Sequence, residues 1–168
     1  MGYSKIKAIP THIPPVEGYE ATFKDWEKKI KGNYPYQVIN PHYLRRSHSV
    51  FDNVQWLRET WPNPVFISVK DAEEKGIKDG DTVLLTSQHG KVLRTACVTE
   101  RFMPGVIGLP HGAWVDIDEK TGIDTGGADN ILCGPISTGQ GVSGWNSCIC
   151  NMEKYTGAPL IPDIEKPQ

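Results

Sequence analysis

Alternating apolar and polar positions dominate the middle of the chain and predict short strands joined by tight turns. Val65–Val69 is a β-branched apolar run, which is typical of a buried strand. Thr82–Ser87 and Lys91–Thr99 flank Gln88-His89-Gly90, and the turn glycine predicts a β-hairpin. Val106–Leu109, behind a Pro-Gly turn, predicts another strand.

Helical patterns are few and short. Lys70–Lys75 predicts a helix of one to two turns that Gly76 ends. Phe23, Trp26 and Ile30 recur at helical spacing and predict a short amphipathic helix over Ala21–Ile30. Phe51–Arg58 is a further candidate for a short helix. Many strands with little helix favour a closed or nearly closed β-barrel, which removes exposed sheet edges.

Composition indicates one turn-rich domain with irregular ends. The chain has 168 residues with 17 glycines and 13 prolines, and 38% of its residues are hydrophobic. We expect a strap with a short helix over residues 1–34, a barrel over 35–156 and a proline-containing arm over 157–168.

Charge and hydropathy exclude several classes of partner. The net charge is −2 and the pI is about 6.2, without a long basic run, which weighs against nucleic acid as the main partner. No apolar stretch approaches the roughly 20 residues that span a bilayer, so direct membrane insertion is not expected. No apolar signal segment follows Met1, and the chain is expected to carry no export signal of its own.

The four cysteines do not match a metal-binding pattern. Zinc and iron–sulfur sites usually show C-x2-C pairs, whereas the close pair here is Cys148-Ile149-Cys150. Its alternation predicts both thiols on one face of a strand. We interpret these two, with Cys97 and Cys133, as free thiols in apolar surroundings, and leave disulfides open.

Residues His42–Ser49 carry the densest candidate chemistry. Within eight residues they hold two imidazoles, two guanidiniums and two hydroxyls, directly after the apolar run from Tyr36. Guanidinium groups bind phosphate through paired hydrogen bonds, and hydroxyls fill further acceptors. The cluster therefore suits an anionic ligand rich in hydrogen-bonding groups. The alternative interpretation is an ordinary solvated loop.

A family resemblance emerges from the order of these motifs. The helix, Gly76-Ile-Lys-Asp-Gly-Asp81, the Ser87-x-His-Gly hairpin and Met103-Pro-Gly-Val-Ile107 resemble the molybdopterin dinucleotide-binding domain. That domain is the C-terminal one of molybdenum oxidoreductases of the dimethyl sulfoxide reductase family. The resemblance runs from about Tyr36 to Tyr155. Four further motifs follow in the family order: His42-x-x-x-Arg46-x-His48-Ser49, Gly112-Ala-Trp114, Asp124-x-Gly-Gly-x-x-Asn130 and Asn146-Ser147.

Residues His48–Asn53, followed by Trp56-Leu57, resemble the catalytic subunits of dimethyl sulfoxide reductases more than formate dehydrogenases or nitrate reductases. The resemblance implies a mainly β fold, a six-stranded double-psi β-barrel with a few short peripheral helices. It also implies a molybdopterin guanine dinucleotide as ligand, two copies of which chelate one molybdenum.

The resemblance assigns a set of cofactor-binding residues to this chain and no catalytic or metal-ligating residue. They are His42, Arg46, His48, Ser49, Asn53, Gly112, Trp114, Asn130, Asn146 and Ser147. The metal ligand of the family lies in other domains, so no cofactor is expected on the isolated chain.

Each assignment has an ordinary structural alternative. His42 and His48 are then loop histidines, Ser49 is a turn or helix-cap residue, and Trp114 belongs to the core. His111 departs from the acidic or small residue of the resembling subunits, so its role stays open.

The function implied is that of a cofactor-binding domain, a C-terminal piece of a reductase of S-oxides or N-oxides in anaerobic respiration. The isolated piece is then inactive. Its implied partners are the remaining domains of the catalytic subunit, an iron–sulfur electron-transfer subunit and a membrane anchor, on the outer face of the cytoplasmic membrane or in the periplasm. The alternative is a free-standing double-psi barrel that acts as a protein-interaction module without a redox cofactor.

Overall fold

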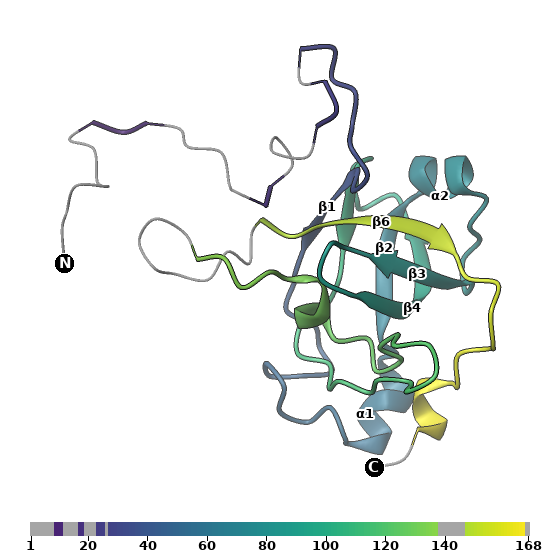
Figure 1. Ribbon diagram of the computed structural model, residues 1–168. Helices are drawn as coiled ribbons and strands as arrows, with labels where there is room; N and C mark the ends of the chain where they lie inside the picture. Colours follow the sequence, from purple (N-terminus) through teal and green to yellow (C-terminus); the bar gives the residue numbers. More distant parts are fainter. Residues whose placement is uncertain (1–8, 12–16, 19–22, 26, 138–146, 167–168) are drawn as a thin grey trace.

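The chain forms a closed six-stranded β-barrel with two short helices on its outside (Figure 1). A computed structural model describes residues 9–11, 17–18, 23–25, 27–137 and 147–166. The strands are β1 (Tyr36–Ile39), β2 (Pro64–Ser68), β3 (Thr82–Thr86), β4 (Lys91–Thr99), β5 (Val106–Gly108) and β6 (Ile149–Lys154). The helices are α1 (Gln55–Thr60) and α2 (Val69–Lys75), with short 3-10 turns η3 (Asp129–Leu132) and η5 (Asp163–Glu165).

Strand order around the barrel is β1-β5-β2-β4-β3-β6, and the ring closes between β6 and β1. The pairs β1–β5 and β2–β4 are parallel, and the other pairs are antiparallel. The predicted strands, the β3–β4 hairpin and the closed barrel are confirmed. The double-psi description of the connections stays a prediction.

The barrel interior is filled by the inward-facing residues of each strand. Val83 and Leu85 of β3 are fully buried, while the residues between and beside them are half-buried. This period-two pattern places every second side chain in one core. Cys148 and Cys150 both belong to that core, as their alternation predicts, and all four cysteines are free thiols, as interpreted from the sequence.

Helix α2 ends at Lys75 as predicted and begins one residue before the predicted Lys70, at Val69. The Ser68 hydroxyl accepts the Asp71 amide at 3.1 Å and caps the first turn. Gly76 follows the last turn with φ 63°, in the left-handed region that glycine tolerates best. Helix α1 starts later than the candidate range Phe51–Arg58, because Phe51 has φ 75° and Val54 is extended.

The helix predicted over Ala21–Ile30 is wrong where the structure describes it. Asp25 and Ile30 form an antiparallel bridge, and both the Lys24 and Asp25 amides donate to the Ile30 carbonyl. The Asp25 carboxylate accepts the Lys28 amide at 3.0 Å, a local bond that competes with helical bonding. The segment therefore turns tightly. Trp26, like residues 19–22, lies outside the described residues.

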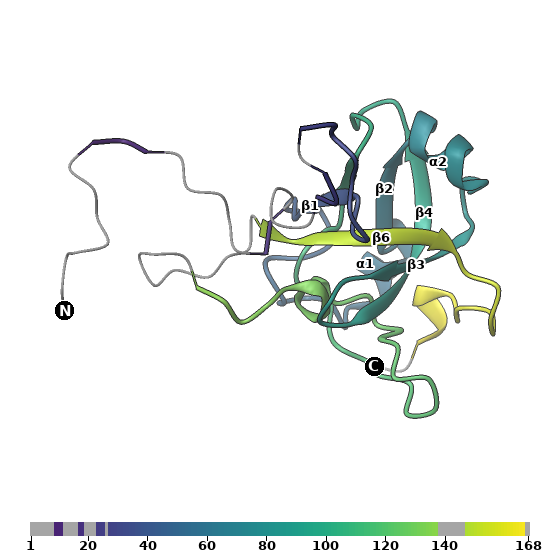
Figure 2. The same ribbon diagram turned by 45° about the horizontal axis from the view of Figure 1, so that its top comes forward.

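The C-terminal arm packs against one end of the barrel. Turn η5 lies beside α1 at that end, and α2 lies at the opposite end (Figures 1 and 2). Arg45 pairs with Asp163 of the arm, and Arg58 donates to the Lys166 carbonyl at 3.0 Å. The predicted domain boundaries at 34/35 and 156/157 stay predictions. No helix in the described part of the chain combines the length and apolarity needed to cross a membrane.

Candidate ligand pocket

A pocket of about 450 Å³ opens where three loops meet beside β1 and η3. One segment follows β1, one follows β5, and the third consists of η3 and the residue after it. The first and the third segment are about 90 residues apart in the sequence. Most of the lining residues have polar side chains, and they are Asn40, His42, His48, Ser49, His111, Gly112, Asp129, Asn130 and Cys133.

Three imidazole rings gather in this pocket. His48 and His111 stack nearly parallel, with ring centroids 5.2 Å apart and an interplanar angle of 9°. His42 meets His111 edge-on at 4.4 Å and His48 at 5.2 Å. The rings offer nitrogen donors and acceptors and a flat surface for a ring-containing ligand. Among the described residues, no group of three or more His, Cys, Asp or Glu is arranged to hold a metal ion.

Close backbone packing fixes the shape of this pocket. Gly112 has φ 88°, and a β-carbon there would overlap the His48 carbonyl oxygen. His48 itself has φ 54°, inside a tight turn closed by the Ser47–Val50 bridge. Two loops thus touch backbone to backbone, and glycine is required at the contact.

Asp129 connects the loops after β1 and β5 by hydrogen bonds. Its carboxylate accepts the Gly112 amide at 3.1 Å and the Asn40 side-chain amide at 3.2 Å. Asn40 also donates to the Leu109 carbonyl at 3.2 Å. Asp129 is buried, so each bond is shielded from water and holds a pocket loop in place.

A second buried carboxylate, Asp52, anchors the ends of two loops. It accepts the Trp114 amide at 2.9 Å, pairs with Arg45 at 2.9 Å and also pairs with Arg46. Burial alone raises the pKa of Asp52, but the Trp114 amide and the two guanidiniums outweigh it and hold the pKa below its ordinary value. Asp52 is therefore charged at neutral pH and holds the His42–Asn53 loop against Trp114.

Arg94 of β4 connects the loops at the centre of this end of the barrel. It is buried and donates to the carbonyls of Pro110 at 3.0 Å and of Gly127, and to the Asn63 side chain. Burial, and after it the charge of Arg46, lower the pKa of Arg94 to about 9. The group remains cationic at pH 7 and binds carbonyls of the loops around it.

Asp124 orders the glycine-rich loop before η3. Its carboxylate accepts three amides, from Asp116 at 2.7 Å, Gly126 at 3.2 Å and Ala128 at 2.6 Å. Gly127 has φ 84°, and a β-carbon there would strike Arg94. Gly127 is thus needed for backbone conformation and close approach to the buried arginine, and a β-carbon at Gly126 would overlap the Trp114 carbonyl.

Sequence reasoning missed the residues that position the pocket. The sequence does hold a signal for each of them. Arg94 interrupts the apolar alternation of β4, Asp52 lies in the motif His48–Asn53, and Asp129 lies in the motif Asp124–Asn130. His111, whose role the sequence left open, lines the pocket.

The structure brings five of the predicted ligand residues into this pocket. They are His42, His48, Ser49, Gly112 and Asn130. Trp114 lies beside it, 49% exposed, with its indole N–H donating to the Ser49 carbonyl at 2.8 Å. Trp114 is therefore not the core residue of the alternative interpretation.

Four predicted residues are placed elsewhere or not described. Asn53 is exposed and is not part of the described lining, and Ser147 lines a small separate cavity beside His89. Arg46 is 7% exposed and pairs with Asp52 beneath the loops. Within the described chain, the Arg46 Nη1 and Nη2 atoms are buried without a hydrogen-bond partner. Asn146 lies outside the described residues.

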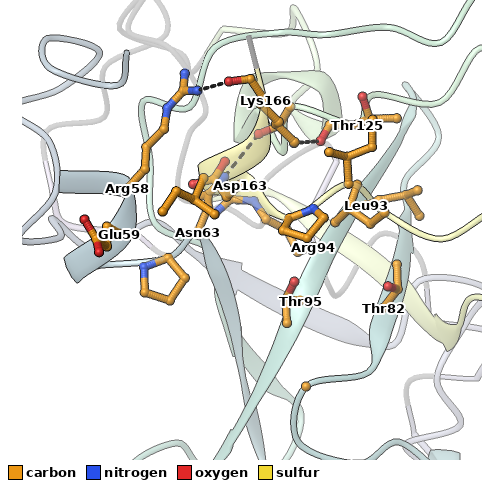
Figure 3. Close-up of a pocket in the computed structure, with 17 residues that line it drawn as sticks. Arg58, Glu59, Asn63, Thr82, Leu93, Arg94, Thr95, Thr125, Asp163 and Lys166 are labelled. Carbon is orange, nitrogen blue, oxygen red and sulfur yellow. Dashed lines mark hydrogen bonds between the residues drawn. The ribbon is translucent and has the colours of Figure 1, made fainter. Parts of the chain in front are cut away.

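A second pocket of about 440 Å³ separates the barrel from the C-terminal arm (Figure 3). Arg58, Asp163 and Lys166 gather at one rim, and Thr82 and Thr95 extend from strands on the other side. Its cations are engaged: Arg58 donates to the Lys166 carbonyl, Lys166 to the Thr125 carbonyl, and Arg94 to carbonyls behind the wall. None of the predicted ligand residues lines this pocket where it is described, so the histidine pocket is the better candidate.

Comparison with protein families places these features in a known context. The family model described as "Molydopterin dinucleotide binding domain" matches residues 36–148, which include all the strands except β6 and every lining residue named for the histidine pocket.

Several curated relatives are reductases. The chain is 37% identical over 121 residues to "Probable dimethyl sulfoxide reductase chain YnfF" of Escherichia coli strain K12, covering 71% of this chain and 15% of that protein. It is 38% identical over 120 residues to "Dimethyl sulfoxide reductase DmsA" of the same strain, with the same coverage. It is 32% identical over 180 residues to "Trimethylamine-N-oxide reductase" of Haemophilus influenzae, covering 100% of this chain and 21% of that protein.

A solved structure shares the fold. Acetylene hydratase from Pelobacter acetylenicus superposes with a TM-score of 0.64 at 18% identity, over 88% of this chain and 21% of that chain. At this identity the likeness supports the fold alone. The chain thus spans between 15% and 21% of the length of these relatives.

Proposed function

Because this chain belongs to the molydopterin dinucleotide binding domain family, we propose that its histidine pocket binds the nucleotide part of a molybdopterin guanine dinucleotide. The observation that carries the proposal is the convergence of five motif residues, from three separate loops, on one pocket. The volume of about 450 Å³ falls in the range usual for small-molecule sites.

The chemistry of the lining fits such a ligand. Ser49 offers a hydroxyl, Asn130 offers an amide with both donor and acceptor, and the histidines offer ring nitrogens and flat faces. Gly112 lets a loop backbone approach closely. Arg46 is not part of the described lining, and it supports the site by pairing with Asp52, which holds the His42–Asn53 loop.

Roles follow for the individual residues. Ser49 and Asn130 hold and orient the ligand by hydrogen bonds, and His48 and His111 present a stacked wall to its rings. Asp129, at the pocket wall, and Asp52, outside the described lining, keep the loops in place. Bound molybdenum cofactors supply the redox chemistry, and the protein supplies binding, orientation and electrostatics.

We propose further that the chain works as one domain of a larger oxidoreductase that reduces S-oxides or N-oxides. Its relatives include dimethyl sulfoxide and trimethylamine-N-oxide reductases, of which it spans between 15% and 21%. On this proposal the isolated chain has no reductase turnover, and its partners are the remaining domains, an iron–sulfur subunit and a membrane anchor.

An apolar rim beside the pocket supports contact with further domains. The rim consists of Leu44, Val50, Phe51, Trp114 and Val115, each between 49% and 74% exposed. Trp114 bonds to the carbonyl of Ser49, next to Val50, so the two loops are continuous here. Large apolar side chains exposed on two neighbouring loops suit a surface that another protein part covers.

Guanosine diphosphate tests the binding proposal, because it contains guanine, ribose and pyrophosphate. Calorimetric titration of the purified chain is expected to give saturable binding, which Ser49→Ala and Asn130→Ala each weaken by about tenfold, the effect of one hydrogen bond. Ser137→Ala, at an exposed serine outside the described lining, is the matched control and leaves binding unchanged.

Wild-type chain that folds but shows no binding of guanosine diphosphate would contradict the nucleotide proposal. That result would favour the alternative of a protein-interaction module without a redox cofactor.

A further inference from the structure

Two thiols, Cys133 and Cys148, lie near each other where η3 meets the start of β6. Cys133 follows η3 and Cys148 precedes β6, and Cys133 packs against the core cluster that contains Cys148. The Cys148 thiol also donates to the carbonyl of Leu132, the neighbour of Cys133, at 3.6 Å. The Cys133 thiol donates to the Asp129 carbonyl at 3.6 Å. The Cys148 thiol is therefore held against the Leu132–Cys133 peptide, next to the Cys133 residue.

The two cysteines differ in access. Cys133 is half-buried and lines the histidine pocket, where a small solute reaches it. Cys148 is 6% exposed and packs in the barrel core. Cys133 is thus the accessible thiol, and Cys148 is the shielded thiol next to it.

Electrostatics gives the accessible thiol the greater reactivity. The hydrogen bond from Cys148 lowers the pKa of Cys133, although burial and the nearby Asp129 and Glu17 oppose it. The pKa of Cys148 is raised by the same hydrogen bond and by burial. Burial also raises the pKa of Cys97 and of Cys150. Since the thiolate is the nucleophile, Cys133 is the thiol that reacts first.

We propose that Cys133 and Cys148 form an oxidisable dithiol, in which a hydroperoxide oxidises Cys133 and Cys148 resolves it to a disulfide. In the first step the Cys133 sulfur attacks one peroxide oxygen, the O–O bond breaks, and a sulfenic acid and one water form from hydrogen peroxide. In the second step the Cys148 sulfur attacks the sulfenic sulfur, and its proton leaves with the hydroxyl as a second water. The two thiols lose two electrons and two hydrogens, and the peroxide takes them up.

The disulfide would alter the wall of the pocket. Both S–H donors disappear, so the Asp129 and Leu132 carbonyls lose their sulfur bonds. Asp129 holds the Gly112 loop, and Asn130 lines the pocket directly. The dithiol therefore couples oxidation to η3, the element that shapes this side of the pocket. This inference does not depend on which ligand the pocket takes.

Intact mass and peptide mapping after treatment of the reduced chain with hydrogen peroxide test the proposal. The wild-type chain is expected to lose two hydrogen atoms, to yield one linked peptide pair containing Cys133 and Cys148, and to recover with dithiothreitol. Cys148→Ser is expected to stop at the sulfenic acid, which dimedone traps at Cys133. Cys133→Ser is expected to remain unoxidised under the same exposure.

Cys97→Ser is the matched control, since Cys97 is a half-buried cysteine of β4 far from this contact in the sequence, and it should form the disulfide like wild type. If a variant fails to fold, the peptide map of the oxidised wild-type chain decides alone. Linkage between any other pair, or oxidation of Cys133 to sulfinic acid without linkage to Cys148, would overturn the proposal. Hydrogen exchange at Asp129–Leu132 should also change on oxidation, and identical exchange would refute the coupling to the pocket.

Discussion

The Gly112 amide donates to the Asp129 carboxylate at 3.1 Å, and the Gly112 α-carbon lies against the His48 carbonyl. One glycine thus joins three loops: the one after β1, the one after β5 and the one that becomes η3. The shape of the pocket depends on this junction more than on any single ligand residue, so the residues that form it are the first to substitute.

Substituting Gly112 by alanine should damage the junction through both backbone conformation and overlap. The φ of 88° is unfavourable for alanine, and the new β-carbon meets backbone that has little freedom to move. We expect a loss of about 2–4 kcal/mol in the free energy of unfolding, measured by urea denaturation.

Gly122→Ala is the control for conformation alone. Gly122 has φ 67°, and no atom lies within 4 Å of the place that a β-carbon would take, so the loss there should be about 1–2 kcal/mol. Equal losses at the two glycines would show that the contact with His48 adds nothing.

Removing the carboxylate of Asp129 should free the pocket loops. Asp129→Ala leaves the Gly112 amide and the Asn40 side chain without their acceptor, and hydrogen bonds to a charged group are worth about 1.5–3 kcal/mol. Chemical denaturation should show that loss, and guanosine diphosphate binding should weaken as well. Asp118→Ala, in an exposed turn, should leave binding unaltered.

The barrel could be predicted from the sequence, whereas the hydrogen bonds of the buried Arg94 could not. Alternation of residues such as Val83 and Leu85 is a local signal, so strand positions follow directly from it. The partners of Arg94 are carbonyls at positions 64, 110 and 127, and only the closed topology brings them together. No local pattern carries that information.

The ligand motifs illustrate the same limit. His48 and Ser49 of the motif line the pocket. Arg46 belongs to the same motif, yet its side chain turns inward and pairs with Asp52. The helix predicted over Ala21–Ile30 failed for a related reason, since the Asp25 side chain captures the Lys28 amide in a turn.

Replacing Arg94 by lysine should destabilise the protein. Arg94→Lys keeps the charge but replaces the planar fork with a single ammonium group, so it loses several of the carbonyl bonds in a buried setting. We expect destabilisation by about 3–5 kcal/mol, as for breaking other buried charged networks. Arg101→Lys, at an exposed arginine, should change the unfolding midpoint little. Comparable effects at both sites would show that Arg94 contributes only its charge.

Stability should fall at acidic pH through Asp52. The folded-state pKa of this carboxyl is below its unfolded value, so at pH below the unfolded value, about 4, the unfolded chain binds more protons than the folded one. Its contribution is therefore complete above that pH and is lost as the pH falls through the folded pKa. Urea midpoints from pH 7 to pH 3 should decline less for Asp52→Asn than for wild type. Parallel declines would assign the acid sensitivity to other carboxyls.

His111 should contribute to ligand binding, although the sequence left its role open. Its ring stacks on His48 and meets His42 edge-on, so removing it opens the flat wall of the pocket. His111→Ala should weaken guanosine diphosphate binding by about 5- to 30-fold, the equivalent of one aromatic contact of about 1–2 kcal/mol. His89→Ala is the matched control, because His89 pairs with Glu17 at the β3–β4 hairpin, outside the described lining. If wild type binds and His111→Ala binds equally well, the histidine stack is not part of the site. If wild type itself does not bind, the nucleotide proposal fails before the role of His111 is tested.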